Sequence, residues 1–180
     1  MKKRLFLILL LGVINLNLNA AKADFTLCKS KFALCTTAPC EPIPGKKGYA
    51  SCRCNVQEGY SVGTKPCSVV KETSKGQAIH SRYYPIKVYA ACTNNRPWAW
   101  CLDSPCLIDK NDPAKASCLC SIVKNQGAYI LVTEHYDQST CSTGLYSSAT
   151  IEQSHQITDF LKNHSELPPF PIKVLNAGDD

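Results

Sequence analysis

The sequence predicts a strand-rich α+β protein that is held together by disulfides and built as a tandem duplication of two small units. Three observations lead to this fold class: twelve cysteines in 180 residues, a repeat in the spacing of those cysteines, and a single helical pattern near the C-terminus. A high and even cysteine count is typical of disulfide frameworks in oxidising compartments.

The N-terminal segment, residues 1–23, has the layout of a secretory signal peptide. Residues 2–4 are basic, residues 5–14 form an apolar run, and Ala21 and Ala23 place small side chains at alternate positions. An apolar run of this length is too short for a membrane anchor, since spanning a bilayer takes about 20 residues. We expect cleavage after Ala23, with Ala21 as the alternative, and a mature chain in the periplasm or outside the cell.

The net charge of the mature chain is small. Residues 1–23 hold four of the 20 Lys and Arg residues and none of the 14 acidic residues, so their removal lowers the formal net charge from +6 to +2. A charge of this size gives no reason to expect nucleic acid as a partner. No later segment is long and apolar enough to span a membrane. We expect the partner to be another exported protein or a cell-envelope component.

The cysteine spacing of the first half of the chain recurs in the second half at a constant shift in residue number, so that Cys35 of the first unit corresponds to Cys101 of the second. The inner four cysteines of each unit follow the pattern C-x4-C-x11-C-x-C, with the same Pro before the second and the same Ala-Ser before the third. Self-similarity at a fixed period marks a repeated structural unit. The outer cysteines keep this offset less well, because the second unit carries an insertion over residues 126–140. The cysteines are Cys28, Cys35, Cys40, Cys52, Cys54 and Cys67 in the first unit, and Cys92, Cys101, Cys106, Cys118, Cys120 and Cys141 in the second.

This repeat divides the mature chain in two. Residues 24–90 form the first cysteine-rich unit with its linker, which we place at the polar residues 68–81. Residues 91–180 form the second unit, which adds the helix and a C-terminal strand.

Local patterns predict the elements of each unit. The helix should begin at Thr150, which forms a capping box with Gln153, and should end before Pro168. A turn at residues 125–127 should join two neighbouring strands as a hairpin. Apolar and β-branched runs bounded by turn residues predict strands at residues 50–56, 83–89, 116–123, 128–133 and 172–175.

The two cysteines of each C-x-C pair should not form a disulfide with each other. On a strand, residues i and i+2 point to the same face and lie about 6.6 Å apart, which is near the outer limit for a disulfide. Cys52 and Cys54 should therefore bond to different partners within the first unit. The sequence leaves open which partners these are.

No catalytic motif is found in the chain. The sequence holds no G-x-S-x-G, no H-E-x-x-H and no phosphate-binding P-loop, and nothing in it predicts a cofactor. We therefore expect a non-catalytic binding or interaction module. Its contact surface is expected at Trp98 and Trp100, which hold both indoles of the chain, and at His135 and Tyr136 in the insertion. The residues equivalent to the two tryptophans in the first unit are Phe32 and Leu34, and these apolar counterparts favour packing in the core as the alternative role for both tryptophans.

Two rival functions come from other classes. A small exported enzyme could use His135 as a base, since Glu134 and Asp137 are its neighbours in sequence. Alternatively, the C-x4-C and C-x-C pairs could offer thiolates to Zn²⁺ or Cu⁺. The C-x-C spacing fits a structural zinc site poorly, and an oxidising compartment favours disulfides.

Overall fold

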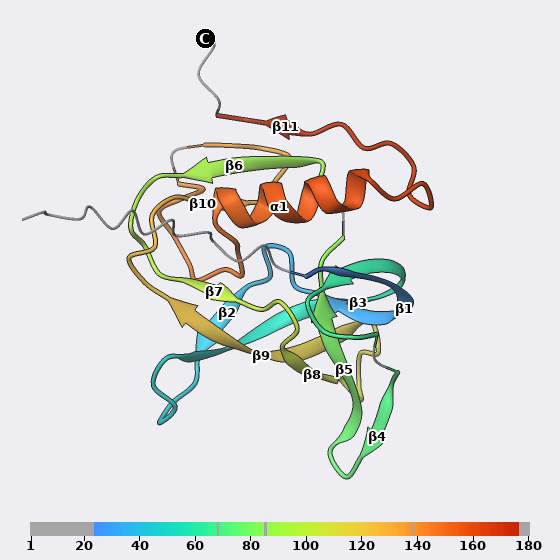
Figure 1. The fold of residues 1–180 in the computed structure, drawn as a ribbon. Helices are drawn as coiled ribbons and strands as arrows, with labels where there is room; N and C mark the ends of the chain where they lie inside the picture. Colours follow the sequence, from blue (N-terminus) through green and yellow to red (C-terminus); the bar gives the residue numbers. More distant parts are fainter. Residues whose placement is uncertain (1–23, 68, 85, 138, 177–180) are drawn as a thin grey trace, which may run out of the picture.

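The computed structural model describes residues 24–67, 69–84, 86–137 and 139–176. Within these ranges the chain is rich in strands and has one helix and six disulfides (Figure 1), as the predicted α+β class requires. The predicted signal peptide, residues 1–23, lies outside the described residues. The elements are β1 Thr26–Leu34, β2 Cys40–Pro42, β3 Tyr49–Gly63, β4 Lys71–Thr73, β5 Gly76–Arg82, β6 Val88–Cys92, β7 Trp98–Trp100, β8 Pro105–Ile108, β9 Lys115–Val123, β10 Tyr129–Leu131, α1 Ile151–Lys162 and β11 Lys173–Val174.

Five strands of the larger sheet pair with one another in a closed ring. β3 pairs antiparallel with both β1 and β9, and β5 joins β1 to β8. Because β8 also pairs with β9, the pairings form a closed ring through β3, β1, β5, β8 and β9. Closure of this kind removes unpaired strand edges and encloses one interior.

The strand registers in the two halves of the chain match at the same constant offset as the cysteines. The matching pairs are Ala33–Val56 with Ala99–Ile122, and Cys40–Cys52 with Cys106–Cys118. Between the halves, Cys52 on β3 lies opposite Cys118 on β9, its own counterpart in the repeat. When two equivalent strands are related by a local two-fold axis, the residue at the axis lies opposite its own equivalent in the other strand. The pairing of Cys52 with Cys118 gives β3 and β9 this register.

Two buried serines connect the halves of the chain. Ser81 donates a hydrogen bond from its hydroxyl to the carbonyl oxygen of Cys101, and Ser147 donates to the carbonyl oxygen of Cys35. Both serines are buried, so these bonds satisfy hydroxyls that water cannot reach. Each half thus supplies a hydrogen bond inside the other, and both halves contribute strands to one continuous sheet.

Two expectations about connecting segments are wrong. Most of the predicted linker, residues 68–81, forms the β4–β5 hairpin, because Ile79 and Ser81 alternate into the core and β5 fills the place between β1 and β8. The predicted turn at residues 125–127 does not join β9 to β10 as a hairpin. β10 pairs with β6 instead, where Tyr129 lies opposite Cys92.

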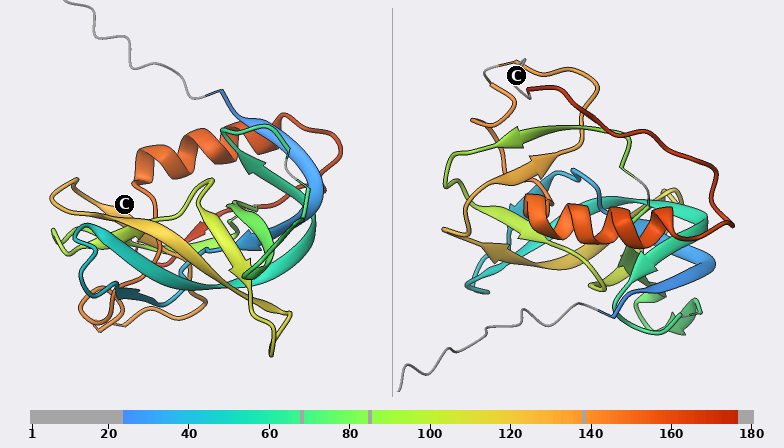
Figure 2. Two further views of the ribbon diagram at one scale, coloured as in Figure 1. Left: turned by 90° about the horizontal axis from the view of Figure 1, so that it is seen from below. Right: turned by 45° about the horizontal axis from the view of Figure 1, so that its top comes forward.

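The helix begins and ends where the sequence predicts. Thr150 accepts a hydrogen bond from the backbone of Gln153 at 3.2 Å, and the Gln153 side chain accepts one from the backbone of Thr150 at 2.9 Å. Ile157 and Leu161 are buried on one face of α1. The smaller sheet, in the order β10-β6-β11, lies beside the helix, and the helix covers the larger sheet (Figures 1 and 2). The predicted C-terminal strand returns as β11, parallel to β6.

All twelve cysteines form disulfides, and both halves use the same order: first with sixth, second with fifth, third with fourth. The cysteines of each C-x-C bond to different partners, which confirms the prediction from strand geometry. The bonds are Cys28–Cys67, Cys35–Cys54, Cys40–Cys52, Cys92–Cys141, Cys101–Cys120 and Cys106–Cys118.

Candidate functional site

The interior of the ring is filled by cystine and by small side chains. The four inner disulfides are buried together with alanines such as Ala50 and Ala116. Sulfur atoms from different disulfides lie close together: those of Cys35, Cys101 and Cys120 are all within 4.8 Å of one another. This clustering resembles a thiolate site, but every cysteine is bonded and none is free. A disulfide sulfur is not a thiolate, so the oxidised protein offers no ligand set of the kind that Zn²⁺ or Cu⁺ needs.

The two tryptophans pack inside the protein. Trp98 is 2% exposed and its ring stacks on that of Tyr129, with 6.4 Å between ring centroids. Trp100 is half-buried and meets both Trp98 and Tyr83 edge to face, at centroid distances of 6.2 and 6.0 Å. Of the four residues predicted for a contact surface, His135 and Tyr136 are therefore the exposed ones.

The loop that carries His135 does not assemble a catalytic couple. Glu134, His135 and Asp137 are all exposed, and no hydrogen bond joins the imidazole to either carboxylate in the described part of the loop. The Asp137 carboxylate instead accepts hydrogen bonds from the backbone and hydroxyl of Ser139, at 2.7 and 2.6 Å. These bonds to its own turn hold the pKa of Asp137 below its usual value.

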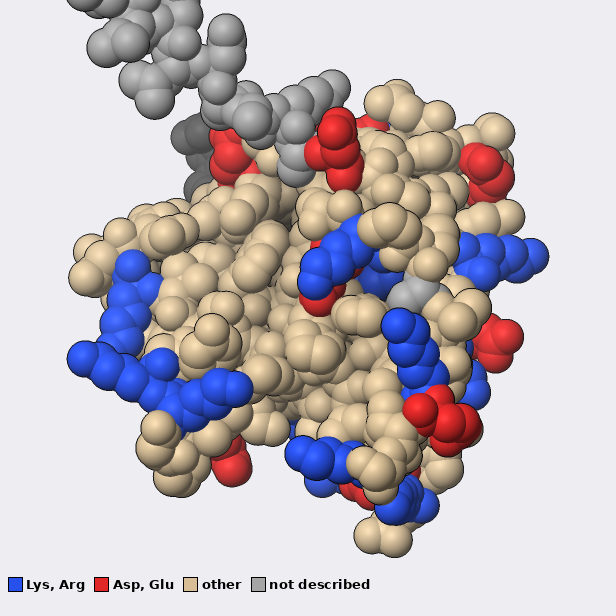
Figure 3. All heavy atoms as spheres, turned by 60° about the horizontal axis from the view of Figure 1, so that its bottom comes forward, with Lys and Arg blue, Asp and Glu red and all other residues tan. Residues whose placement is uncertain are grey.

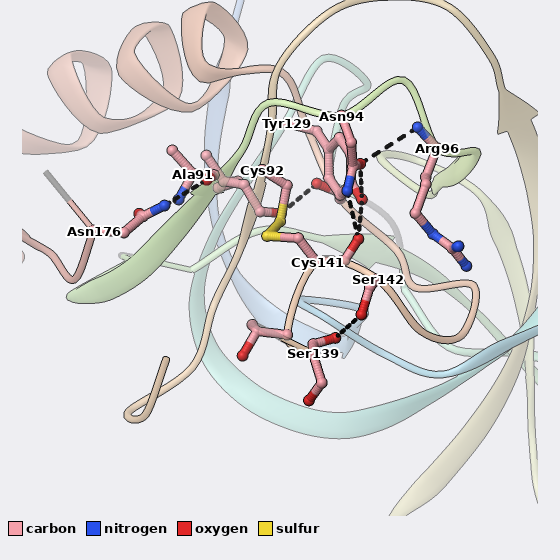
Figure 4. Close-up of a disulfide and its surroundings, with 12 residues drawn as sticks. Ala91, Cys92, Asn94, Arg96, Tyr129, Ser139, Cys141, Ser142 and Asn176 are labelled. Atoms are coloured by element: carbon pink, nitrogen blue, oxygen red, sulfur yellow. Dashed lines mark hydrogen bonds between the residues drawn. A yellow bond between two sulfur atoms is a disulfide. The ribbon is translucent and has the colours of Figure 1, made fainter. Parts of the chain in front are cut away.

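The base of this loop is fixed to β6. The Cys92–Cys141 disulfide joins the end of β6 to the loop, as Figure 4 shows. The Asn94 side-chain amide donates to the carbonyl oxygen of Cys141 at 2.7 Å, and the Tyr129 hydroxyl donates to the Asn94 side-chain oxygen at 3.1 Å. The Cys141 end of the loop is thereby held in place by Cys92 and Tyr129, which are buried, and by Asn94, which is partly buried.

One buried ion pair lies between the two halves. Arg82 and Asp103 are almost fully buried, and their nearest charged atoms are 3.6 Å apart. Arg82 also donates to the carbonyl oxygens of Thr26 and Lys65, and the Asp103 carboxylate accepts two hydrogen bonds from Thr64. Burial lowers the pKa of Arg82, and the charge of Asp103 opposes that shift. Because these groups face one another and not a cavity, their role is structural.

The small pocket beneath α1 is too small for a ligand. It is bounded by residues of the ring and the helix, including Tyr83, Ser147 and Ile157, and has a volume of about 20 Å³. A cavity of this size holds about one water molecule. The Tyr83 hydroxyl that borders it donates to the carbonyl oxygen of Ser148, and burial raises the pKa of Tyr83.

Two neighbouring hollows on the surface have the dimensions of a binding site. Two hollows of about 410 and 520 Å³ share Leu34 and Tyr84 as part of their walls, and ligand pockets commonly have volumes of about 300–1,000 Å³. Segments far apart in the chain line these hollows, among them residues 57–60 on β3, residues 132–134 after β10, and residues 167–168 after α1. We call these two neighbouring hollows the Tyr84 groove.

The chemistry of the Tyr84 groove is mixed. Apolar side chains such as Leu34 and Ile86 form part of its wall, while Glu58 and Glu134 place a carboxylate in each hollow. Tyr84 is 38% exposed. The sequence reasoning missed this groove, although the adjacent pair Tyr83-Tyr84 carries a signal. On an extended segment one of two neighbouring residues faces the core and the other the solvent, and here Tyr83 is the buried one.

The Tyr84 groove reaches the predicted contact surface at one end. Residues 132–134 line it and lead directly into His135 and Tyr136. No described helix is long and apolar enough to cross a membrane. The six disulfides indicate an oxidising location, either periplasmic or extracellular. In comparisons with known proteins, no family model, no curated protein and no solved structure matches this chain.

Proposed function

We propose that this protein is an exported, non-catalytic binding module whose ligand is an extended peptide segment of another exported protein. The observation that carries this proposal is the Tyr84 groove, two neighbouring hollows with partly apolar walls, in which Glu58 lines one hollow and Glu134 and Lys87 line the other. Extended peptides bind such grooves through apolar anchors, and a few polar groups fix their position.

Export is supported by the N-terminal sequence and by the sulfur chemistry. Residues 1–23 have the basic start, the apolar run and the small-residue box of a signal peptide. Six disulfides persist only where the surroundings are oxidising. Cross-links in this number also suit a scaffold that must keep its binding groove in shape outside the cell.

We also propose that the chain arose by duplication of one small unit. The spacing and bonding of the four inner cysteines and the strand registers around them recur at one constant offset along the chain, and the outer cysteines keep the same pairing order. Ser81 and Ser147 are separated by the same offset, and each donates to the opposite half. The two copies would then have diverged in their loops, where the second carries the helix and the insertion.

The proposed function is tested by selecting ligands without assuming their identity. The mature protein is used to select binders from a displayed library of random peptides, and their affinity is measured by fluorescence anisotropy. Tyr84→Ala should weaken binding about thirty-fold, as expected for a central aromatic contact worth about 2 kcal/mol. Tyr49→Ala is the matched control, since Tyr49 is 40% exposed on a different surface. Equal losses in both variants would contradict the groove as the site.

Two measurements separate this proposal from its rivals. If the protein were a hydrolase using His135, activity found by a broad substrate screen should vanish in His135→Ala. A count of free thiols in the denatured, unreduced mature protein addresses the metal alternative. We expect a value near zero, whereas four or more thiols per chain would favour a thiolate site.

A further inference from the structure

The charged residues of the mature chain are segregated between its two halves. Residues 24–90 carry ten Lys and Arg residues against four acidic ones, whereas residues 91–180 carry six against ten. The small net charge of +2 therefore conceals a basic half and an acidic half. Part of the acidic excess lies on and just after α1 and on the loop after β10, at Glu134, Asp137, Glu152, Asp159 and Glu166.

Lysines project from two hairpins at the opposite end of the molecule from α1. The turn between β2 and β3 carries Lys46 and Lys47, and the β4–β5 hairpin carries Lys71 and Lys75. The Lys110 side chain lies against the second hairpin, close to the backbone of Gly76. Figure 3 shows Lys and Arg side chains spread over several parts of this face, some of them next to acidic side chains and others surrounded by uncharged surface. We call these five lysines and their surroundings the basic end.

The basic end keeps a net positive charge, since its five lysines outnumber the neighbouring acidic residues Glu72, on the second hairpin, and Asp109, which precedes Lys110. All five lysines are exposed, and none takes part in a salt bridge within the described ranges of the chain. His80 on β5 responds to the positive field of this region. Burial lowers its pKa most, the charges of Lys65, Lys71 and Arg82 lower it further, and the charge of Asp103 opposes them. A site with uncompensated positive charge attracts anionic partners.

Exposed apolar side chains lie among these lysines. Val69 is 76% exposed and lies between Lys65 and Lys71 in the chain. Tyr49 is 40% exposed beside the other hairpin turn, with the Lys46 ammonium 4.8 Å from the centre of its ring. Aliphatic and aromatic side chains flanked by lysines suit the boundary between lipid headgroups and acyl chains. A purely polyanionic partner such as nucleic acid would gain nothing from Val69.

We propose that the basic end docks onto a membrane surface that carries anionic lipid headgroups. The lysines would supply electrostatic attraction to the headgroup phosphates, and Val69 and Tyr49 would enter the interfacial layer. This proposal does not depend on a ligand in the Tyr84 groove, since it uses different residues and a different surface.

Sedimentation of the full mature chain with lipid vesicles tests the proposal. The protein should bind vesicles of phosphatidylcholine mixed with phosphatidylglycerol, should not bind phosphatidylcholine alone, and should dissociate as salt is raised. Each neutralised lysine should weaken partitioning about five-fold. The Lys71→Gln/Lys75→Gln variant should therefore bind the anionic vesicles roughly twenty-five-fold more weakly than the wild type. Lys162→Gln/Lys173→Gln, which removes the same charge from α1 and β11, should bind as the wild type does.

Val69→Ser distinguishes a membrane from other polyanions. Loss of this aliphatic contact should weaken vesicle binding about ten-fold, and should leave retention on a heparin column unchanged. Equal binding to neutral and anionic vesicles would overturn the proposal. So would vesicle binding that Val69→Ser does not alter, because a contact made by charge alone would not be specific for a membrane.

Discussion

Removal of the Asp103 carboxylate should destabilise the protein more than any substitution of an exposed charge. Asp103 lies 3.6 Å from the Arg82 guanidinium in a site that water does not reach. At that distance the attraction is about 4–5 kcal/mol for an effective dielectric constant of about 20. Asp103→Ala also deletes both hydrogen bonds that Thr64 donates to the carboxylate. Breaking one side of a buried pair typically costs about 3–5 kcal/mol.

We expect Asp103→Ala to lower the free energy of unfolding by about 3–4 kcal/mol. The loss of stability should stay below the upper end of the range for a broken buried pair, about 5 kcal/mol, because Arg82 keeps its hydrogen bonds to Thr26, Ser61 and Lys65. Equilibrium unfolding in guanidinium chloride, with the disulfides intact, measures the change. Asp159→Ala on the exposed face of α1 is the control and should change stability by less than about 0.5 kcal/mol.

A double substitution checks the reasoning behind that number. Asp103→Leu/Arg82→Met replaces both charges with apolar groups and should recover part of the stability that Asp103→Ala loses. The part that remains lost is the cost of placing Ala or Leu in the left-handed backbone of residue 103, where φ is 57°. The reasoning would be refuted if Asp103→Ala cost less than about 1 kcal/mol, the value typical of an exposed pair. A double variant whose loss of stability equals the losses of the two single variants added together would also contradict a coupling between the two charges.

Further predictions concern the same fold. Thr150→Ala removes the helix cap and should cost about 1 kcal/mol in the same unfolding assay. Gly63→Ala should be strongly destabilising in that assay, because a Cβ there would overlap the buried ion pair. Limited reduction followed by alkylation should label Cys28 and Cys67 first, read by peptide mass spectrometry, since only this disulfide has an exposed sulfur-bearing residue. The Asp137 carboxyl carbon should titrate by NMR with a pKa below the usual aspartate value, so that its turn stays ordered at neutral pH and loosens only as pH falls through that lowered pKa.

Local features of the fold could be predicted from the sequence because local chemistry sets them. The capping box at Thr150 depends on residues three positions apart, and the helix forms there. The rule that Cys52 cannot bond to Cys54 follows from strand geometry alone. Both predictions use contacts within a few residues, where the physics needs no knowledge of distant parts of the chain.

The remaining features depend on which distant segments meet. The nested disulfide order requires Cys28 to meet Cys67 across 39 residues, and no local pattern selects that partner. The apolar counterpart Phe32 already favours a packed Trp98, but the neighbours of Trp98 in sequence do not reveal that Tyr129 is the residue that covers it. The Tyr84 groove was missed because its walls come from separate parts of the chain.

The nested disulfide order also bears on how the protein is made. Synthesis begins at the N-terminus, so cysteines become available for oxidation in chain order. Bonds formed on arrival join neighbouring cysteines, but only Cys40–Cys52 and Cys106–Cys118 join neighbours in that order. The other four bonds must wait for a later cysteine or replace an earlier, wrong bond by thiol exchange, which takes seconds to hours without an isomerase. Maturation of this protein should therefore be limited by disulfide isomerisation, and its yield should follow the isomerase supply of the compartment.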